Sequence, residues 1–395
     1  MTYFAGLLVI ALLIFLIYKI DRIRNIFILL NNFPFLKLHY LVYGIILTLF
    51  FPDNFMVLFE RIKGSVLIFC LLWIGICYGC TLEIRTHQRF SFNTLIFHII
   101  EPVAVFLCVA LGGIMYKYIV FREMDLFVIM IIALSSSLTL FRKESPPKRE
   151  TENTYYSIIS DLLPLRNIFP VTALCIVSIV LNRTNGIVVF GHTYTGVFTL
   201  LFFHVILGIS SGILYNILLA GARSTDSLLL VIIGVTAFTG GVVYMFSLSP
   251  IFVGMLAGAF LINSTLKRLQ TLEAFAVSHE SIEKIFMFFL GVLSVQLIQS
   301  VRLNLVVIFT GALGLFGFRS LLKYFGANLW VLFSHDYPRG SLLLWIGLTS
   351  QGLLAAGAAL ESWFNILHSS FVFLFIIILL ILNQIAMGIF VLRNR

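Results

Sequence analysis

The chain has 395 residues, of which 60% are hydrophobic and only 11% are charged, and its formal net charge is +9. Soluble globular proteins carry about 45–50% apolar and about 25% charged residues, so this composition excludes a water-soluble protein. A membrane-spanning helix needs about 20 apolar residues, and the loops left between such helices are too short for a nucleotide-binding or regulatory domain. In a membrane protein an excess of Lys and Arg indicates topology, so nucleic acid is not expected as a partner.

Apolar runs bounded by charged or turn residues predict thirteen membrane-spanning helices and hence an all-α polytopic fold. In chain order they lie near residues 3–20, 38–51, 64–82, 92–116, 125–141, 155–181, 187–220, 227–246, 249–265, 282–299, 303–322, 340–359 and 366–391. Residues 1–395 are therefore expected to form one transmembrane domain without a soluble regulatory domain. The amphipathic segment 266–283 is interpreted as an interfacial connector, with a gating or docking helix as the alternative.

The distribution of basic residues predicts the orientation of these helices. Of the 26 Lys and Arg residues, nineteen fall on one side of the layout, six fall on the other, and Arg166 lies inside a span. Because basic residues accumulate in cytoplasmic loops, the larger group, which includes Arg319 and Lys323, is assigned to the cytoplasm. This places the N-terminus outside and the C-terminus in the cytoplasm.

A run of hydroxyl residues lies in the middle of the predicted span 125–141, at Ser135, Ser136, Ser137 and Thr139. Where a helix unwinds, such hydroxyls can satisfy backbone groups and, with freed carbonyl oxygens, coordinate a small cation. The alternative is a face of small residues that packs against another helix. The predicted span 340–359 has a similar polar interruption at Thr349, Ser350, Gln351 and Gly352.

One carboxylate, Asp161, lies within the predicted span 155–181 and is the clearest candidate for an ion-binding residue. A buried carboxylate can bind either a proton or a monovalent cation, and this competition is sufficient for exchange. Arg166 follows in the same span, so the alternative is an ion pair that merely neutralises both charges. Pro164 lies between them and is expected to bend the helix.

Several segments resemble the cation:proton antiporters, especially the bacterial branch that includes glutathione-gated potassium efflux systems. The segment with the strongest resemblance is FSLSPIFVGMLAGAFLINS (246–264), and ALSSSLTLF (133–141) resembles the unwound fifth helix of the family. The sequence around Ser160 and Asp161 is similar to the sixth-helix signature, in which an acidic residue carries the ion. The other segments that carry the resemblance are LHYLVYGIIL (38–47), CLLWIGICYGCTLEI (70–84), KIFMFFLGVLSVQ (284–296) and LTSQGLLAAGAA (348–359).

The resemblance implies a sodium/proton-antiporter-like fold of about thirteen helices, with inverted repeats and two discontinuous helices that cross. It implies scaffold or dimer helices and a mobile core near 64–181 and 282–391. Asp161 would carry the proton or cation, and Ser160, Ser135–Thr139, Ser350 and Gln351 would line the crossing. The implied activity is antiport of Na⁺ or K⁺ against H⁺ by alternating access, with no enzymatic activity and no cofactor. The resemblance also implies a homodimer in a bacterial inner membrane. A separate soluble regulatory subunit is an optional partner.

The sequence also departs from the family pattern at functional positions. Position 160 is Ser, where relatives carry Asp, Asn or Gln, and position 353 is Leu, where an acidic residue is frequent. The basic residue of the tenth helix is missing from 285–299, and Arg166 is the candidate that replaces it. These departures support an alternative function, a homologue that has lost transport and serves as a structural or regulatory membrane subunit.

Overall fold

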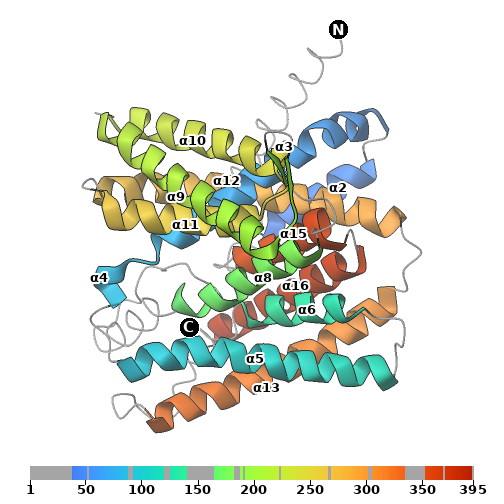
Figure 1. The fold of residues 1–395 in the computed structure, drawn as a ribbon. Coiled ribbons are helices and arrows are strands. Elements are labelled where there is room, and N and C mark those ends of the chain that lie inside the picture. The colour runs from blue at the N-terminus through green and yellow to red at the C-terminus, as the bar shows by residue number, and fades with distance from the viewer. Residues whose placement is uncertain are drawn as a thin grey trace.

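The structure is a computed structural model of the chain. It describes residues 38–50, 53–87, 92–119, 125–139, 164–181, 187–189, 192–221, 224–265, 268–300, 305–333, 352–367 and 370–393. Almost all of these residues are helical, and Figure 1 shows the helices packed as two neighbouring groups.

The first group surrounds the long helix α3, which packs against α11, α10 and α12. Its members are α2 (Leu38–Phe50), α3 (Asp53–Cys80), α9 (Val197–Gly221), α10 (Thr225–Met245), α11 (Pro250–Ser264) and α12 (Arg268–Ser300), and the short α4 (Ile84–His87) follows α3. Glycines allow α3 and α11 to approach closely, since a Cβ atom at Gly75 would lie 2.5 Å from the carbonyl oxygen of Ile251. Membrane helices use small residues in this way because lipid supplies no hydrophobic force to hold them together.

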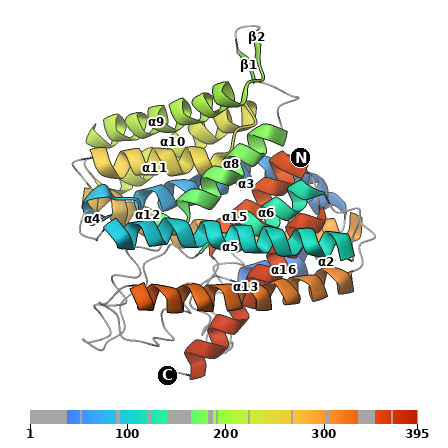
Figure 2. The same ribbon diagram turned by 60° about the horizontal axis from the view of Figure 1, so that its bottom comes forward.

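The second group consists of two sets of helices, and the middle helix of each set borders an extended residue. The first set is α5 (Phe92–Ile119), α6 (Leu126–Ser137) and α8 (Ile168–Leu181); the second is α13 (Leu305–Phe333), α15 (Leu353–Glu361) with the π-helix η3 (Ser362–Leu367), and α16 (Ser370–Arg393). The chain becomes extended at Leu138 directly after α6, and Gly352 is extended directly before α15. Helices α6 and α15 contact each other, as Figure 2 illustrates.

Six helices of the described part are long and apolar enough to cross a membrane. They are Ile62–Cys80, His98–Tyr118, Pro164–Leu181, Val197–Gly221, Asp226–Met245 and Arg268–Ile298, and five shorter apolar helices accompany them. Large apolar side chains such as Phe198 (88%) and Leu230 (74%) remain exposed on the outer helices, where lipid would cover them. The chain is therefore an integral, multi-pass membrane protein. The predicted number of thirteen spans stays a prediction.

Three predicted boundaries are wrong, and the first two concern segments 187–220 and 266–283. The span expected at 187–220 begins with a hairpin of β1 (Ile187–Val189) and β2 (His192–Tyr194), in which Ile187 pairs with Tyr194. The β-branched residues of these strands favour extended backbone, and the helix α9 begins only at Val197. Segment 266–283 is also not a separate connector, because α12 runs without a break from Arg268 to Ser300.

The third wrong boundary concerns the predicted span 303–322. Helix α13 continues to Phe333, so Arg319 and Lys323 lie within the helix, and both side chains are fully buried. Their assignment to a cytoplasmic loop is therefore wrong. The apolar residues that follow Lys323 continue the helix, and the two basic side chains need partners inside the protein.

Candidate functional site

The run of hydroxyl residues marks the end of α6 inside the protein. Ser135, Ser136, Ser137 and Thr139 are all fully buried, and α6 ends at Ser137. The hydroxyls of Ser135 and Ser136 donate to the carbonyl of Ile132 at 2.9 and 2.7 Å, and Ser137 donates to Leu134 at 2.7 Å. The hydroxyl hydrogens are thus used within the last turns of α6. Helix α6 thus ends inside the predicted span 125–141, and the residues that follow Thr139 lie outside the described residues.

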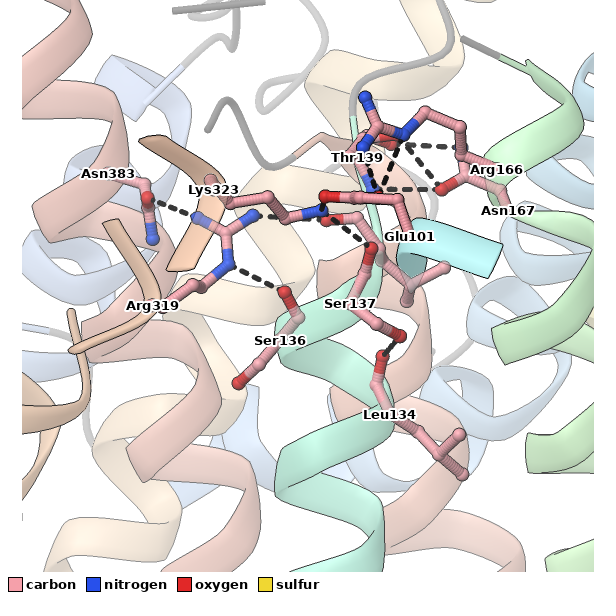
Figure 3. A network of polar contacts seen from close by, with 11 residues as sticks. Glu101, Leu134, Ser136, Ser137, Thr139, Arg166, Asn167, Arg319, Lys323 and Asn383 are labelled. Carbon is pink, nitrogen blue, oxygen red and sulfur yellow. Dashed lines mark hydrogen bonds and ion pairs between the residues drawn. The ribbon is translucent and has the colours of Figure 1, made fainter. Parts of the chain in front are cut away.

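The carbonyl groups at the end of α6 accept hydrogen bonds from two basic side chains of α13. Arg319 donates from Nε to the carbonyl of Ser136 at 2.6 Å and from Nη2 to that of Leu138 at 3.2 Å. Lys323 Nζ lies 3.5 Å from the carbonyl oxygen of Ser137. A helix end leaves such carbonyls without intrahelical partners and carries a partial negative charge, so cations stabilise it. Figure 3 shows both side chains directed at the end of α6.

Glu101 of α5 holds two of the buried cations. Its Oε1 lies 3.0 Å from Lys323 Nζ, and its Oε2 accepts a hydrogen bond of 3.1 Å from Arg166 Nε, with Arg166 Nη2 also in contact. Glu101 is 4% exposed, and Arg166 and Lys323 are fully buried. Buried charges require partners of this kind because removal from water is costly. We call Glu101, Arg166, Arg319 and Lys323 the Glu101 cluster.

Asn167 fixes the extended chain that follows α6. Its Nδ2 donates to the carbonyl of Thr139 at 3.0 Å, and its Oδ1 accepts from the Thr139 backbone N–H at 2.8 Å. The amide side chain thus supplies both partners that a neighbouring peptide group would supply. Tyr78 of α3 donates to the carbonyl of Pro164 at 2.9 Å, which connects the same turn to the first group of helices.

The structure brings together part of the predicted site. Ser135, Ser136, Ser137, Thr139 and Arg166 meet where α6 ends, with Arg166 paired to Glu101. The remaining predicted site residues lie outside the described residues: Ser160, Asp161, Ser350 and Gln351. A contact between Asp161 and Arg166 therefore stays a prediction.

Among the described residues, sequence reasoning missed four buried charged residues: Glu283, Arg319, Lys323 and Glu361. Arg319 and Lys323 are spaced to share one face of a helix that then continues with apolar residues, a signal that they lie within a span. Glu361 is the only carboxylate in the sequence between Arg339 and Arg393, and it directly follows a predicted span. A single acidic residue in so long an apolar region is a signal of burial.

The arrangement of the helices is shared with a solved antiporter structure, in agreement with the fold that the resemblance in the sequence led us to expect. The structure of the sodium proton antiporter MjNhaP1 from Methanocaldococcus jannaschii at pH 8 matches this chain with a TM-score of 0.57 and 14% identity, over 90% of each chain. No family model matches the sequence, and no curated protein matches it. At this identity the likeness establishes the shared fold.

Proposed function

We propose that this protein exchanges a monovalent cation, Na⁺ or K⁺, for H⁺ across a membrane by alternating access, with Asp161 as the group that binds the ion or the proton. The proposal is supported by the fold, which it shares with a sodium proton antiporter. The observation that carries it is the end of α6 at Ser137 in the buried core, on a helix that contacts α15. Transporters of this general kind bind ions where discontinuous helices meet.

The proposed role of Asp161 follows from its place in the sequence. It lies three residues before Pro164, the first residue of the described turn that leads to Arg166 and Asn167. Asn167 holds the chain that follows α6, so this turn and the break belong to one hydrogen-bonded unit. A carboxylate there would compete between a proton and a cation, and each would leave as the other binds.

The test is cation-dependent dissipation of a proton gradient in proteoliposomes that contain a pH-sensitive dye. We expect Na⁺ or K⁺, but not choline, to dissipate the gradient with wild-type protein, and Asp161→Asn to abolish the response. Glu83→Gln is a matched carboxylate control, because Glu83 pairs with Arg268 at the end of α3 away from the break. Wild-type activity in Asp161→Asn would contradict the proposed role.

A second candidate function is a structural or regulatory membrane subunit that has lost transport. Arg319 and Lys323 favour it, since their fixed positive charges already occupy the carbonyl oxygens at the end of α6. A metal cation at the same oxygens would be repelled by both side chains. This candidate predicts no exchange by the wild-type protein at any pH and co-purification with a second chain. Cation-dependent exchange would rule it out.

The assembly and orientation are proposed on the same basis. We infer a homodimer in a bacterial inner membrane, with the N-terminus outside and the C-terminus in the cytoplasm. A soluble regulatory subunit is a further option, because the chain is expected to carry no soluble domain. Native mass spectrometry would measure the oligomeric state and reveal any bound subunit. Reporter fusions at each terminus would test the orientation.

A further inference from the structure

Glu361 is a buried carboxylic acid that the proposed transport mechanism does not use. It is the last residue of α15, directly before the π-helix η3, and it is fully buried. Neither of its carboxyl oxygens has a hydrogen bond of normal geometry to a described residue. Short π-helical segments frequently occur at functional sites, so Glu361 is a candidate functional residue.

The carboxyl group of Glu361 has hydrogen-bonding neighbours, and no described cation pairs with it. Its polar neighbours are the side chain of Ser249 and the backbone N–H of Ile251, both at the start of α11. The thiol of Cys175, from α8, is the one ionisable side chain of the described residues that interacts with it. No described Lys or Arg forms an ion pair with Glu361, in contrast to Glu101.

The helices around Glu361 offer few other groups that could carry charge. Of the elements that contact α15 and η3, the helices α6 and α11 carry no ionisable residue, and α16 carries only Arg393 at its far end. Helix α3 carries Lys63, whose Nζ lies 5.7 Å from the ring centre of Trp363 in η3. The buried stretch of α3 also carries three thiols and a phenol, namely Cys70, Cys77, Cys80 and Tyr78. Lys63 forms no ion pair with Glu361, and neither Lys63 nor these four groups is among the groups that act on its carboxyl. His204 is committed elsewhere, because its Nδ1 lies 2.7 Å from the carbonyl of Leu200 and its Nε2 accepts from the Ser249 N–H.

This environment favours the neutral acid and still permits ionisation. A buried carboxylate loses the water that stabilises its charge, and here no ion pair replaces that water. The protonated form is therefore favoured. The N-terminal end of α11 carries a partial positive charge, and Ser249 and Ile251 can donate to the carboxylate once the proton leaves. We propose that Glu361 is a second proton-binding site of the chain, which binds and releases one proton at the start of α11, apart from the Glu101 cluster.

The Glu361 site differs from the Glu101 cluster in the helices that form it and in its chemistry. In the cluster, Glu101 is held as a carboxylate by two cations, whereas Glu361 has none among the described residues. Binding a proton at Glu361 converts an acceptor-only carboxylate at the start of α11 into a neutral acid that can also donate. The inference does not depend on transport, because proton binding can be observed in a protein that moves no ion.

The test is infrared difference spectroscopy of the full chain reconstituted in phospholipid, from about pH 6 to about pH 9. We expect the wild type to lose a protonated-carboxyl C=O band and gain carboxylate bands as the pH rises, and Glu361→Gln to lack this pair. Glu83→Gln is the matched control that keeps the pair, because Glu83 forms an ion pair with Arg268, in contrast to Glu361. Asp161→Asn separates any contribution of Asp161 from that of Glu361.

Glu361→Asp keeps the experiment decisive if Glu361→Gln does not fold. A carboxyl group on the shorter side chain should shift the band in frequency without removing it. The proposal is overturned if the titrating band persists unchanged in Glu361→Gln or Glu361→Asp. It is equally overturned if the wild type has no protonated-carboxyl band that responds to pH after the Asp161 contribution is removed.

Discussion

The Glu101 cluster makes a quantitative prediction about stability. Glu101→Gln removes the one described carboxylate that faces Arg166 and Lys323, both of which are fully buried. Breaking a buried ion pair by removal of one partner costs about 3–5 kcal/mol, because the other charge stays buried without compensation. Here two cations lose the same partner. We therefore expect Glu101→Gln to lower the free energy of unfolding by about 3–5 kcal/mol, at the upper end of that range.

Removal of a cation from the same cluster should lower the free energy of unfolding much less than removal of Glu101. Lys323→Met leaves Glu101 paired with Arg166 and removes one of three buried cations, and the hydrogen bond to Ser137 that it loses is long, at 3.5 Å. Replacing a buried charge by an apolar side chain of similar size is often close to neutral when no charge is left unpaired. We expect Lys323→Met to stay within about 1 kcal/mol of the wild type.

Unfolding in detergent, followed by tryptophan fluorescence during titration with SDS, measures both variants. Glu83→Gln is the control, since its partner Arg268 is 35% exposed and such pairs contribute about 0–1 kcal/mol. The expected order of destabilisation is Glu101→Gln well above Lys323→Met, with Glu83→Gln near the wild type. The reasoning is refuted if Lys323→Met costs as much as Glu101→Gln, or if Glu101→Gln is no worse than the control.

Three further predictions concern how the helices are held together. Asn167→Ala should lower the free energy of unfolding by about 1–3 kcal/mol, because two buried backbone groups lose their partner. Asn263→Ala removes a similar pair of contacts at an exposed site and should lower it by less than about 1 kcal/mol. Equal losses in SDS unfolding would contradict this. Gly79→Ala should cost about 1–3 kcal/mol because the added Cβ meets the backbone of α11, while Gly241→Ala, with nothing within 4 Å, should be neutral or stabilising by about 0.5 kcal/mol. A neutral Gly79→Ala in thermal unfolding would disprove the close approach of α3 and α11. Arg319→Lys should cost about 1–3 kcal/mol and speed amide hydrogen exchange at the end of α6, since an ammonium cannot reproduce the guanidinium's contacts with two carbonyls and an amide. Unchanged exchange there would show that Arg319 does not hold the helix end.

Much of the fold follows from the sequence because lipid imposes a simple rule on composition. Backbone groups in a bilayer must be paired within the protein, so long apolar runs become helices and their approximate positions can be predicted. The hydroxyl run indicated where α6 ends, because Ser135, Ser136 and Ser137 are poor helix formers that can bond to the preceding turn, although the sequence left helix packing as an alternative. Helix ends were harder to predict, as α9 and α13 illustrate, because hairpins and buried charges resemble loops in a linear pattern.

The charged part of the site could not be predicted because its partners are far apart in the sequence. Arg319 and Lys323 were assigned to a loop since most basic residues of membrane proteins lie outside the bilayer. Their burial depends on Glu101 and on the carbonyls after α6, which belong to the other set of helices. Arg166 was expected beside Asp161 because the two are close in sequence, and its described partner is Glu101.

The three carbonyls at the end of α6 differ in how firmly they are occupied, and this difference bears on transport. Arg319 is always charged and holds the carbonyls of Ser136 and Leu138 at 2.6 and 3.2 Å. Lys323 lies 3.5 Å from the Ser137 carbonyl but 3.0 Å from Glu101, so the carboxylate holds it more closely than the helix end does. An ammonium on a flexible stem can turn fully toward Glu101, whereas a guanidinium bound to two carbonyls and Asn383 cannot leave without breaking all three contacts. If the proposed exchange takes place, the Ser137 carbonyl is therefore the oxygen at the end of α6 that the cation would reach at the lowest cost.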